Sequence, residues 1–102
     1  MVSNRRTRHL VKPSEAEKRI ATALSKGAIQ LDLSRLQLTT LPKSLGRLTQ
    51  LRRLFVWGNQ LTTLPEALGK LTQLQHFDAS FNQLTVLPET LSQLRACLKL
   101  SS

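Results

Sequence analysis

The sequence predicts an α/β solenoid, in which similar units coil one after another with parallel strands on one face and short helices on the other. The unit is visible as the phrase LTTLP at 38–42, which returns at 61–65 and, as LTVLP, at 84–88, so its period is 23 residues. Each unit opens with alternating apolar and polar residues, the pattern of a strand, and continues as LPxxLxxL, the pattern of a short helix. Because a period of about 20 to 50 residues is typical of stacked arrays, and one strand recurs in each coil, the strands must run parallel.

The first element along the chain is a basic segment, residues 1–13. Its basic side chains are Arg5, Arg6, Arg8 and Lys12. We expect a flexible tail, because the segment has few apolar residues to bury. It starts like a signal peptide but lacks the apolar stretch that would have to follow. The chain has a formal net charge of +9, of which residues 1–27 account for +5, with seven Lys or Arg against two Glu.

A helix is predicted over 14–27. Ser14 is suited to cap its start, and Glu17, three residues later, completes the pattern of a capping box. Gly27 is suited to end it. Its apolar residues recur every four positions on one face, namely Ala16, Ile20 and Leu24. A helix this short is not stable alone, so we expect it to cover the leucines of the first repeat as a terminal cap.

Three complete repeats and the start of a fourth follow, at 28–50, 51–73, 74–96 and 97–102. We expect strands near 29–33, 52–56 and 75–79, and helical segments near 42–48, 65–71 and 88–94. In the fourth unit, the 23-residue spacing places Cys97 at the first leucine position and Leu100 at the fourth. Arrays need capped ends for solubility. The last residues therefore predict a fragment of a longer array, an open edge that docks on another copy or a partner, or a short array whose tail folds over.

The middle repeat, LRRLFVWGNQLTTLPEALGKL, resembles the leucine-rich repeat pattern LxxLxLxxNxLxxLPxxLxxL. Its length and the segment LPEALGKL resemble the Ras-group or plant-intracellular-type subclass, which is common in bacterial intracellular proteins. The entry AEKRIATALSKGAIQLDLSRLQLTTLP resembles repeat domains that precede Roc-COR GTPase or other signalling modules. The resemblance covers residues 28–96 and implies strands on a concave face and short helices on a convex face.

The resemblance also implies a ladder of asparagines that bond the backbone inside each bend. Asn59 and Asn82 match the asparagine position of the pattern. Leu36 holds this position in the first repeat, so we expect looser hydrogen bonding in that turn.

The resemblance implies that a protein or peptide partner binds the concave face, where alternate strand residues point outward. The predicted binding residues are Gln30, Asp32, Arg53, Phe55, Trp57, His76, Asp78, Ser80 and Phe81. Phe55 and Trp57 stand where the neighbouring repeats have Asp and Ser, and exposed aromatic residues are frequent binding hot spots. The alternative is that Trp57 leans over the leucine core or packs on the tail. Arg53 is suited to a cation–π contact with these rings.

Catalysis finds little support in the sequence. Asp32 and Asp78 share a column two strands apart, roughly 10 Å, on a surface without a cleft. His76 has no second metal ligand near it, and Cys97 has no adjacent base. We therefore predict a non-enzymatic scaffold with no catalytic residues, no cofactor and no metal. A single cysteine fits a reducing compartment, and no apolar run reaches the length of a membrane span, so we expect a cytoplasmic protein.

Two other functions stay open. The chain is the detached repeat part of a Roc-COR-like GTPase or another signalling enzyme, or it is a nucleic-acid or membrane-surface adaptor that uses the basic tail. The sequence disfavours nucleic acid as a partner, because no Phe or Trp precedes Phe55 to stack on bases. Membrane contact by the tail is disfavoured as well. Self-association through the C-terminal edge is a further alternative.

Overall fold

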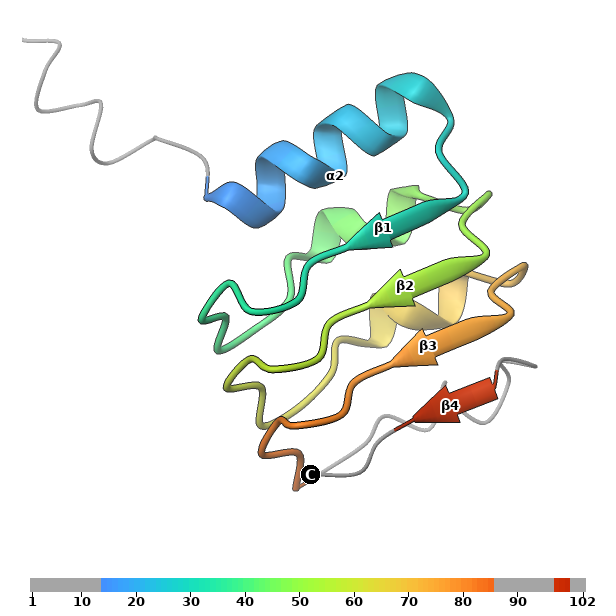
Figure 1. Cartoon of the computed structure of the whole chain (residues 1–102). Coiled ribbons are helices and arrows are strands. Elements are labelled where there is room, and N and C mark those ends of the chain that lie inside the picture. The colour runs from blue at the N-terminus through green and yellow to red at the C-terminus, as the bar shows by residue number, and fades with distance from the viewer. Residues whose placement is uncertain (1–13, 86–96, 100–102) are drawn as a thin grey trace, which may run out of the picture.

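A computed structural model of the chain describes residues 14–85 and 97–99. Its elements are the helix α2 (Glu15–Lys26), the strands β1 (Gln30–Asp32), β2 (Arg53–Phe55), β3 (His76–Asp78) and β4 (Cys97–Lys99), and the 3-10 helices η1 (Lys43–Arg47) and η2 (Glu66–Lys70). Figure 1 shows the strands stacked in chain order below α2, with η1 and η2, the green and yellow turns, behind the sheet. The predicted tail at 1–13 and the helical segment at 88–94 lie outside the described residues.

The sheet is parallel throughout, with the order β1-β2-β3-β4. The first three strands pair without offset. Gln30 is opposite Arg53, which is opposite His76, and Asp32 is opposite Phe55 in the same way. This is the 23-residue step of the sequence, so the predicted α/β solenoid with one strand per coil is confirmed.

The fourth strand departs from that step. β4 pairs with β3 so that Leu98 lies opposite the buried Phe77 and Cys97 lies opposite His76. The 23-residue spacing predicts Leu100 opposite Phe77, so the expected register of the last unit is wrong by two residues. The reason is that alternation along a strand has a period of two, and a two-residue shift leaves the alternation of CLKL in phase with the sheet.

The core is a column of leucines between the sheet and the 3-10 helices. Among its fully buried members are Leu45, Leu54, Leu68 and Leu71, each from a position that recurs in every repeat. Each 3-10 helix begins after a proline that is still extended, with a ψ angle of 145° at Pro42. The backbones pack closely on this side, because a Cβ built on Gly46 would lie 3.0 Å from the Cβ of Ala67 in η2.

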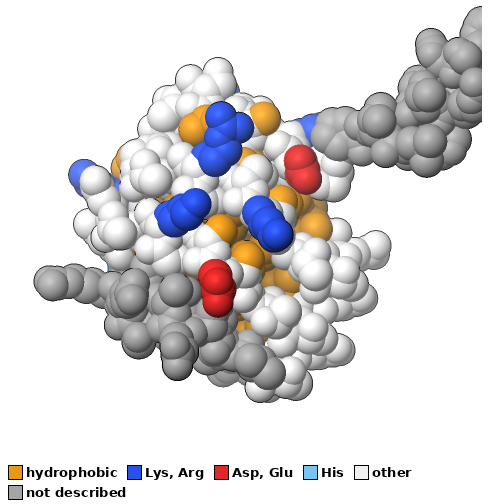
Figure 2. All heavy atoms as spheres, turned by 180° about the vertical axis from the view of Figure 1, so that it is seen from behind, with side chains coloured by type: hydrophobic (Ala, Val, Ile, Leu, Met, Phe, Trp, Pro, Cys, Tyr) orange, Lys and Arg blue, Asp and Glu red, His pale blue; other side chains and the backbone are white. Residues whose placement is uncertain are grey.

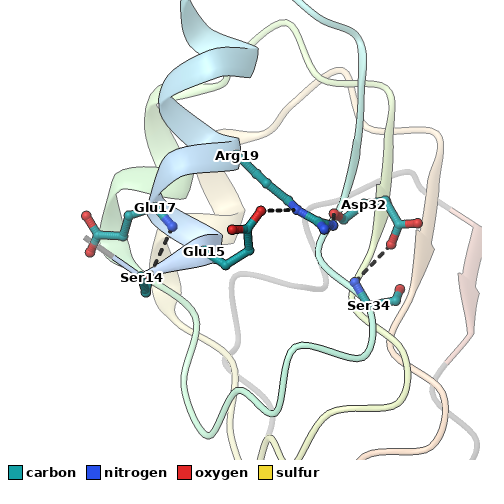
Figure 3. Close-up of polar contacts among 6 residues, drawn as sticks. All are labelled: Ser14, Glu15, Glu17, Arg19, Asp32 and Ser34. Atoms are coloured by element: carbon teal, nitrogen blue, oxygen red, sulfur yellow. Dashed lines mark hydrogen bonds and ion pairs between the residues drawn. The ribbon is translucent and has the colours of Figure 1, made fainter. Parts of the chain in front are cut away.

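The helix α2 covers the first coil, as predicted for a capping helix. It buries Ala16, Ile20 and Ala23 and packs on β1 and η1. The Ser14 hydroxyl accepts a hydrogen bond from the Glu17 N–H at 3.1 Å. Among the described residues, only this half of the predicted capping box is present, and Figure 3 shows the Glu17 carboxylate turned away from Ser14.

An arginine joins the helix to the edge strand. The Arg19 guanidinium lies 3.0 Å from a carboxylate oxygen of Glu15 and donates to the backbone carbonyl of Asp32 at 2.7 Å (Figure 3). An edge strand exposes backbone groups that invite pairing with another chain. Arg19 occupies one of these groups, so it helps to close the N-terminal edge of the sheet.

Candidate functional site

The turn that follows each strand is bonded by an asparagine side chain. Asn59 is buried, and its Nδ2 donates to the carbonyls of Val56 at 2.9 Å and Leu33 at 3.0 Å. Its Oδ1 accepts from the N–H groups of Leu36 and Leu38. Three of these four partners belong to the preceding coil. One asparagine therefore closes its own turn and the turn before it.

Asn82 repeats this arrangement one coil later. Its Oδ1 accepts from the Leu61 N–H at 3.0 Å, and its Nδ2 donates to the carbonyls of Val56 and Ala79 at 3.0 Å. The first coil has Leu36 at the asparagine position, but its turn is bonded by Asn59 from the second coil. The first turn thus lacks the internal asparagine bond that the next two turns have, but it keeps the bonds from the following coil.

Six of the predicted binding residues lie on the strand face, in two rows that run across the sheet. Gln30, Arg53 and His76 form one row, and Asp32, Phe55 and Asp78 form the next. The side chains of the first row are exposed, and Phe55 and Asp78 are half-buried. Trp57 follows β2 on the same coil and is also half-buried. We call Arg53, Phe55 and Trp57 the central strip of the concave face.

The third row, which consists of Ser34, Trp57 and Ser80, turns partly inward. Ser80 is only 6% exposed, and Ser34, two coils earlier, is buried as well. Ser80 is thus not available on the surface, contrary to its predicted place on the concave face. The cause is that the backbone leaves the strand conformation here, with positive φ angles of 57° at Arg35 and 58° at Phe81. Phe81 stays outside and is 66% exposed.

The two aspartates of the concave face have a role that the sequence analysis missed. The Asp32 carboxylate accepts a hydrogen bond from the Ser34 N–H at 2.9 Å (Figure 3), and the Asp78 carboxylate accepts one from the Ser80 N–H at 3.0 Å. Each aspartate therefore caps the end of its strand. The repeated letters LDLS and FDAS were the available signal, because an Asp two residues before a turn is suited to this bond.

The middle coil lacks this cap, because Phe55 occupies the aspartate position. Among the residues that the structure describes, no acceptor bonds the N–H of Trp57, which corresponds to the N–H groups of Ser34 and Ser80. The two aromatic residues thus change the polar chemistry of the strand end as well as its shape.

A cation stacks on the tryptophan, but it is Arg35 rather than the predicted Arg53. The Arg35 guanidinium lies 6.0 Å from the centre of the Trp57 ring. Gly58 permits this arrangement in two ways. Its φ of +73° is unfavourable for other residues, and a Cβ built on it would lie 3.0 Å from the Cγ of Arg35.

The opposite face of the molecule has a different character. Figure 2 shows Lys and Arg side chains spread over a largely polar surface, with hydrophobic atoms visible between them. The exposed cations of η1 and η2 are Lys43, Arg47 and Lys70. The described part of the chain has no comparable pair of aromatic residues on these helices.

Neither catalysis nor metal binding gains support from this geometry. Asp32 and Asp78 are separated by the whole of β2, and each is engaged at the end of its own strand. Within 14–85 and 97–99, no three residues of the His, Cys, Asp and Glu types come together as metal ligands. Over the same residues, every helix is too short or too polar to cross a membrane.

Comparison with known proteins agrees with the fold. The sequence model of the family described as Leucine Rich Repeat matches residues 50–71 and 73–94. The leucine-rich repeat protein soc-2 homolog of Nematostella vectensis is 44% identical over 46 residues, which are 45% of this chain and 8% of that protein. A solved leucine-rich repeat protein of Leptospira interrogans has a TM-score of 0.67 and 33% identity, over 76% of this chain and 21% of that chain. The chain therefore contains leucine-rich repeats and has the fold of leucine-rich repeat proteins.

Proteins of this family generally act as scaffolds that bind other proteins and are typically not enzymes. The chain spans less than a quarter of the length of both relatives. The finer assignment to the Ras-group or plant-intracellular-type subclass stays a prediction.

Proposed function

We propose that the chain binds a protein or peptide partner on its concave face, centred on the central strip. The supporting observation is the pair of half-exposed aromatic residues, Phe55 and Trp57, at positions where both neighbouring coils have Asp and Ser. Nothing in the packing of the coils requires these rings, because Asp and Ser occupy the same places in the same fold. Aromatic residues at the centre of an exposed face are frequent hot spots of binding.

The size of the face limits the affinity. Three coils whose strands lie about 4.8 Å apart, each with about five residues along the face, cover roughly 240 Å², which side-chain relief about doubles. A standard interface buries about 800 Å² on each partner. We therefore expect a dissociation constant of about 1 μM or weaker for the isolated chain. A longer array, or a partner that also uses the edge at 97–102, would bind more tightly.

The proposal is tested by affinity capture with three versions of the immobilised chain. These are the wild type, Trp57→Ala, and Arg47→Ala as a control from the exposed convex surface. We expect a set of proteins that the wild type and Arg47→Ala retain and Trp57→Ala loses, although all three show the same circular dichroism spectrum. The captured proteins are then titrated as purified proteins. Equal retention by Trp57→Ala would place the binding surface elsewhere.

The two alternatives from the sequence remain proposals of lower rank. A detached part of a Roc-COR-like or other signalling enzyme would still bind through the same face. An adaptor that binds nucleic acid or membranes through the basic tail would lose affinity steeply as the salt concentration rises. A partner that depends on Trp57 and is insensitive to removal of residues 1–13 would exclude the adaptor.

A further inference from the structure

From the missing cap in the middle coil we infer that the partner contributes a carboxylate side chain, from an acidic segment, to the N–H of Trp57. This inference rests on the proposed function, because it names the chemistry that the concave face recognises. The incoming carboxylate would do for the middle coil what Asp32 and Asp78 do for the coils on either side.

The N–H groups at this position of the second and third coils have no ladder bond to the coil before. In a parallel ladder the natural acceptor for the N–H of Ser80 would be the carbonyl of Val56, one coil earlier. That carbonyl is occupied by Asn82, whose Nδ2 lies 3.0 Å away. The N–H of Ser80 is satisfied instead by Asp78 at 3.0 Å. In the third coil the asparagine ladder thus displaces one N–H, and an aspartate recovers it.

The middle coil has the same displacement without the recovery. The carbonyl of Leu33, the ladder acceptor for the N–H of Trp57, accepts from Asn59 at 3.0 Å instead, and no bond joins it to Trp57. Phe55 has no acceptor to offer. Among the described residues the N–H of Trp57 therefore stays without a partner, on the side of the sheet from which Asp32 and Asp78 reach the equivalent groups. A donor without an acceptor inside the protein is open to an acceptor that a ligand supplies, and the bond strengthens when the ligand excludes water.

The surroundings favour an anionic acceptor with apolar neighbours. Arg35 is held over the Trp57 ring at 6.0 Å, and Arg53 is exposed two residues before Phe55. Asp32 and Asp78 flank the site on the adjacent strands, but each already accepts an N–H. The two guanidinium groups offset these two charges, and hydrogen bonds to a carboxylate are stronger than those to a neutral carbonyl. The rings of Phe55 and Trp57 would contact apolar side chains beside the carboxylate.

The state of the N–H in the free chain gives the first test. Amide hydrogen exchange, followed by NMR on the full chain, should be at least about tenfold faster at Trp57 than at Ser34 and Ser80. Comparable protection at all three amides would mean that Trp57 already has an acceptor, and the inference would be wrong.

The second test uses a matched pair of peptides on the ¹⁵N-labelled chain. The probe is acetyl-Gly-Leu-Asp-Leu-Gly-amide, and the control replaces its Asp with Asn. We expect the Asp peptide to shift the backbone amide signal of Trp57 in a saturable way, and the Asn peptide to bind at least about tenfold more weakly. If both peptides shift the concave-face signals equally, the carboxylate is not recognised, although binding by the concave face stands.

A substitution in the chain itself separates the cap from the ring. Phe55→Asp should restore the internal cap, raise the urea midpoint and abolish the response of Trp57 to the Asp peptide. Phe55→Ala removes the ring without adding an acceptor, so it should weaken the response and leave the preference for Asp over Asn unchanged. An undiminished response in Phe55→Asp would overturn the inference. Loss of the partner in Trp57→Ala remains the separate test of the proposed function, whatever the peptides show.

Discussion

The interior and the concave face of the same coils follow different rules. Inside, the strand position occupied by Leu31 is apolar in all three coils, with Leu54 and Phe77 beside it. On the concave face, the adjacent position changes from Asp32 to Phe55 and back to Asp78. The interior must repeat because each coil packs against the next, whereas a side chain that faces outward has no such neighbour to satisfy. Variation on the concave face therefore marks the part of the molecule that is free to be specific.

The largest effect on stability is expected inside the middle coil. Leu71 is fully buried between neighbouring repeats, and Leu71→Ala should lower the free energy of unfolding by about 2–5 kcal/mol through lost burial and a cavity. Urea denaturation measures it as a lower midpoint. The control is Thr72→Ala, at an exposed position one residue later. Similar losses at both sites would contradict the difference between interior and surface.

Leu98 does not serve as that control. The 23-residue spacing puts the leucine positions of the last unit at Cys97 and Leu100, so it predicts a small loss on substitution of Leu98. The register of β4 instead places it opposite the buried Phe77.

The next effect concerns the polar part of the interior. Asn59→Ala should cost about 2–4 kcal/mol, because it leaves the Leu33 carbonyl and the N–H groups of Leu36 and Leu38 in the first coil without partners. Gln60→Ala, at the exposed neighbouring position, should stay within about 0.5 kcal/mol. Urea denaturation of the two variants gives the comparison. A loss at Asn59 no larger than that at Gln60 would show that water replaces the ladder without cost.

Gly58 lies at the boundary between interior and concave face. Gly58→Ala should cost about 1–2 kcal/mol for a left-handed residue with a Cβ, with a further loss from the contact with Arg35. Gly27→Ala is the matched control, since its φ is +61° but nothing lies within 4 Å of the added Cβ. Trp57 is the only tryptophan of the chain, so its fluorescence reports whether Arg35 is displaced. An unchanged emission spectrum in Gly58→Ala would show that Arg35 keeps its place.

The smallest effect on stability is expected on the concave face itself. Trp57→Ala removes a half-buried ring and its contact with Arg35, which should change the free energy of unfolding by less than about 1 kcal/mol. Binding of the captured partner should nevertheless be lost in calorimetric titration. A stability loss as large as that of Leu71→Ala would mean that the ring belongs to the core, which is the alternative that the sequence left open.

The parts of the fold that repeat were predictable from the sequence, and the parts that depart from repetition were not. The leucine columns and the proline positions fix the step of 23 residues, and the step fixes the parallel pairing of β1, β2 and β3. The register of β4 was not predictable, because CLKL fits the sheet equally well after a shift of two residues. Alternation alone does not tell how large a step the last unit takes.

The concave face was predictable in its rows but not in its hydrogen bonds. Alternation correctly brings Gln30, Arg53 and His76 together. Alternation wrongly places Ser80 on the surface. The next residue, Phe81, has a left-handed backbone conformation, which alternation does not predict. The contact of Arg35 with Trp57 was missed for the same reason, since Arg35 reaches the ring from a residue with a positive φ. Such turns depend on the backbone of the neighbouring coil, which a single repeat does not reveal.

The asparagine ladder gives the array a direction in which it can lengthen by duplication of its gene segment. Because Asn59 bonds the N–H groups of Leu36 and Leu38 in the coil before it, each coil is completed by its successor. A copied unit inserted after residue 50 would supply an asparagine to the first coil and receive Asn59 from the next. A copy inserted ahead of residue 28 would be followed by a coil with Leu36 at the asparagine position, so its turn would lack the bonds that a following asparagine supplies. Growth of the array by whole units is therefore favoured within the repeats and disfavoured at the junction with the capping helix.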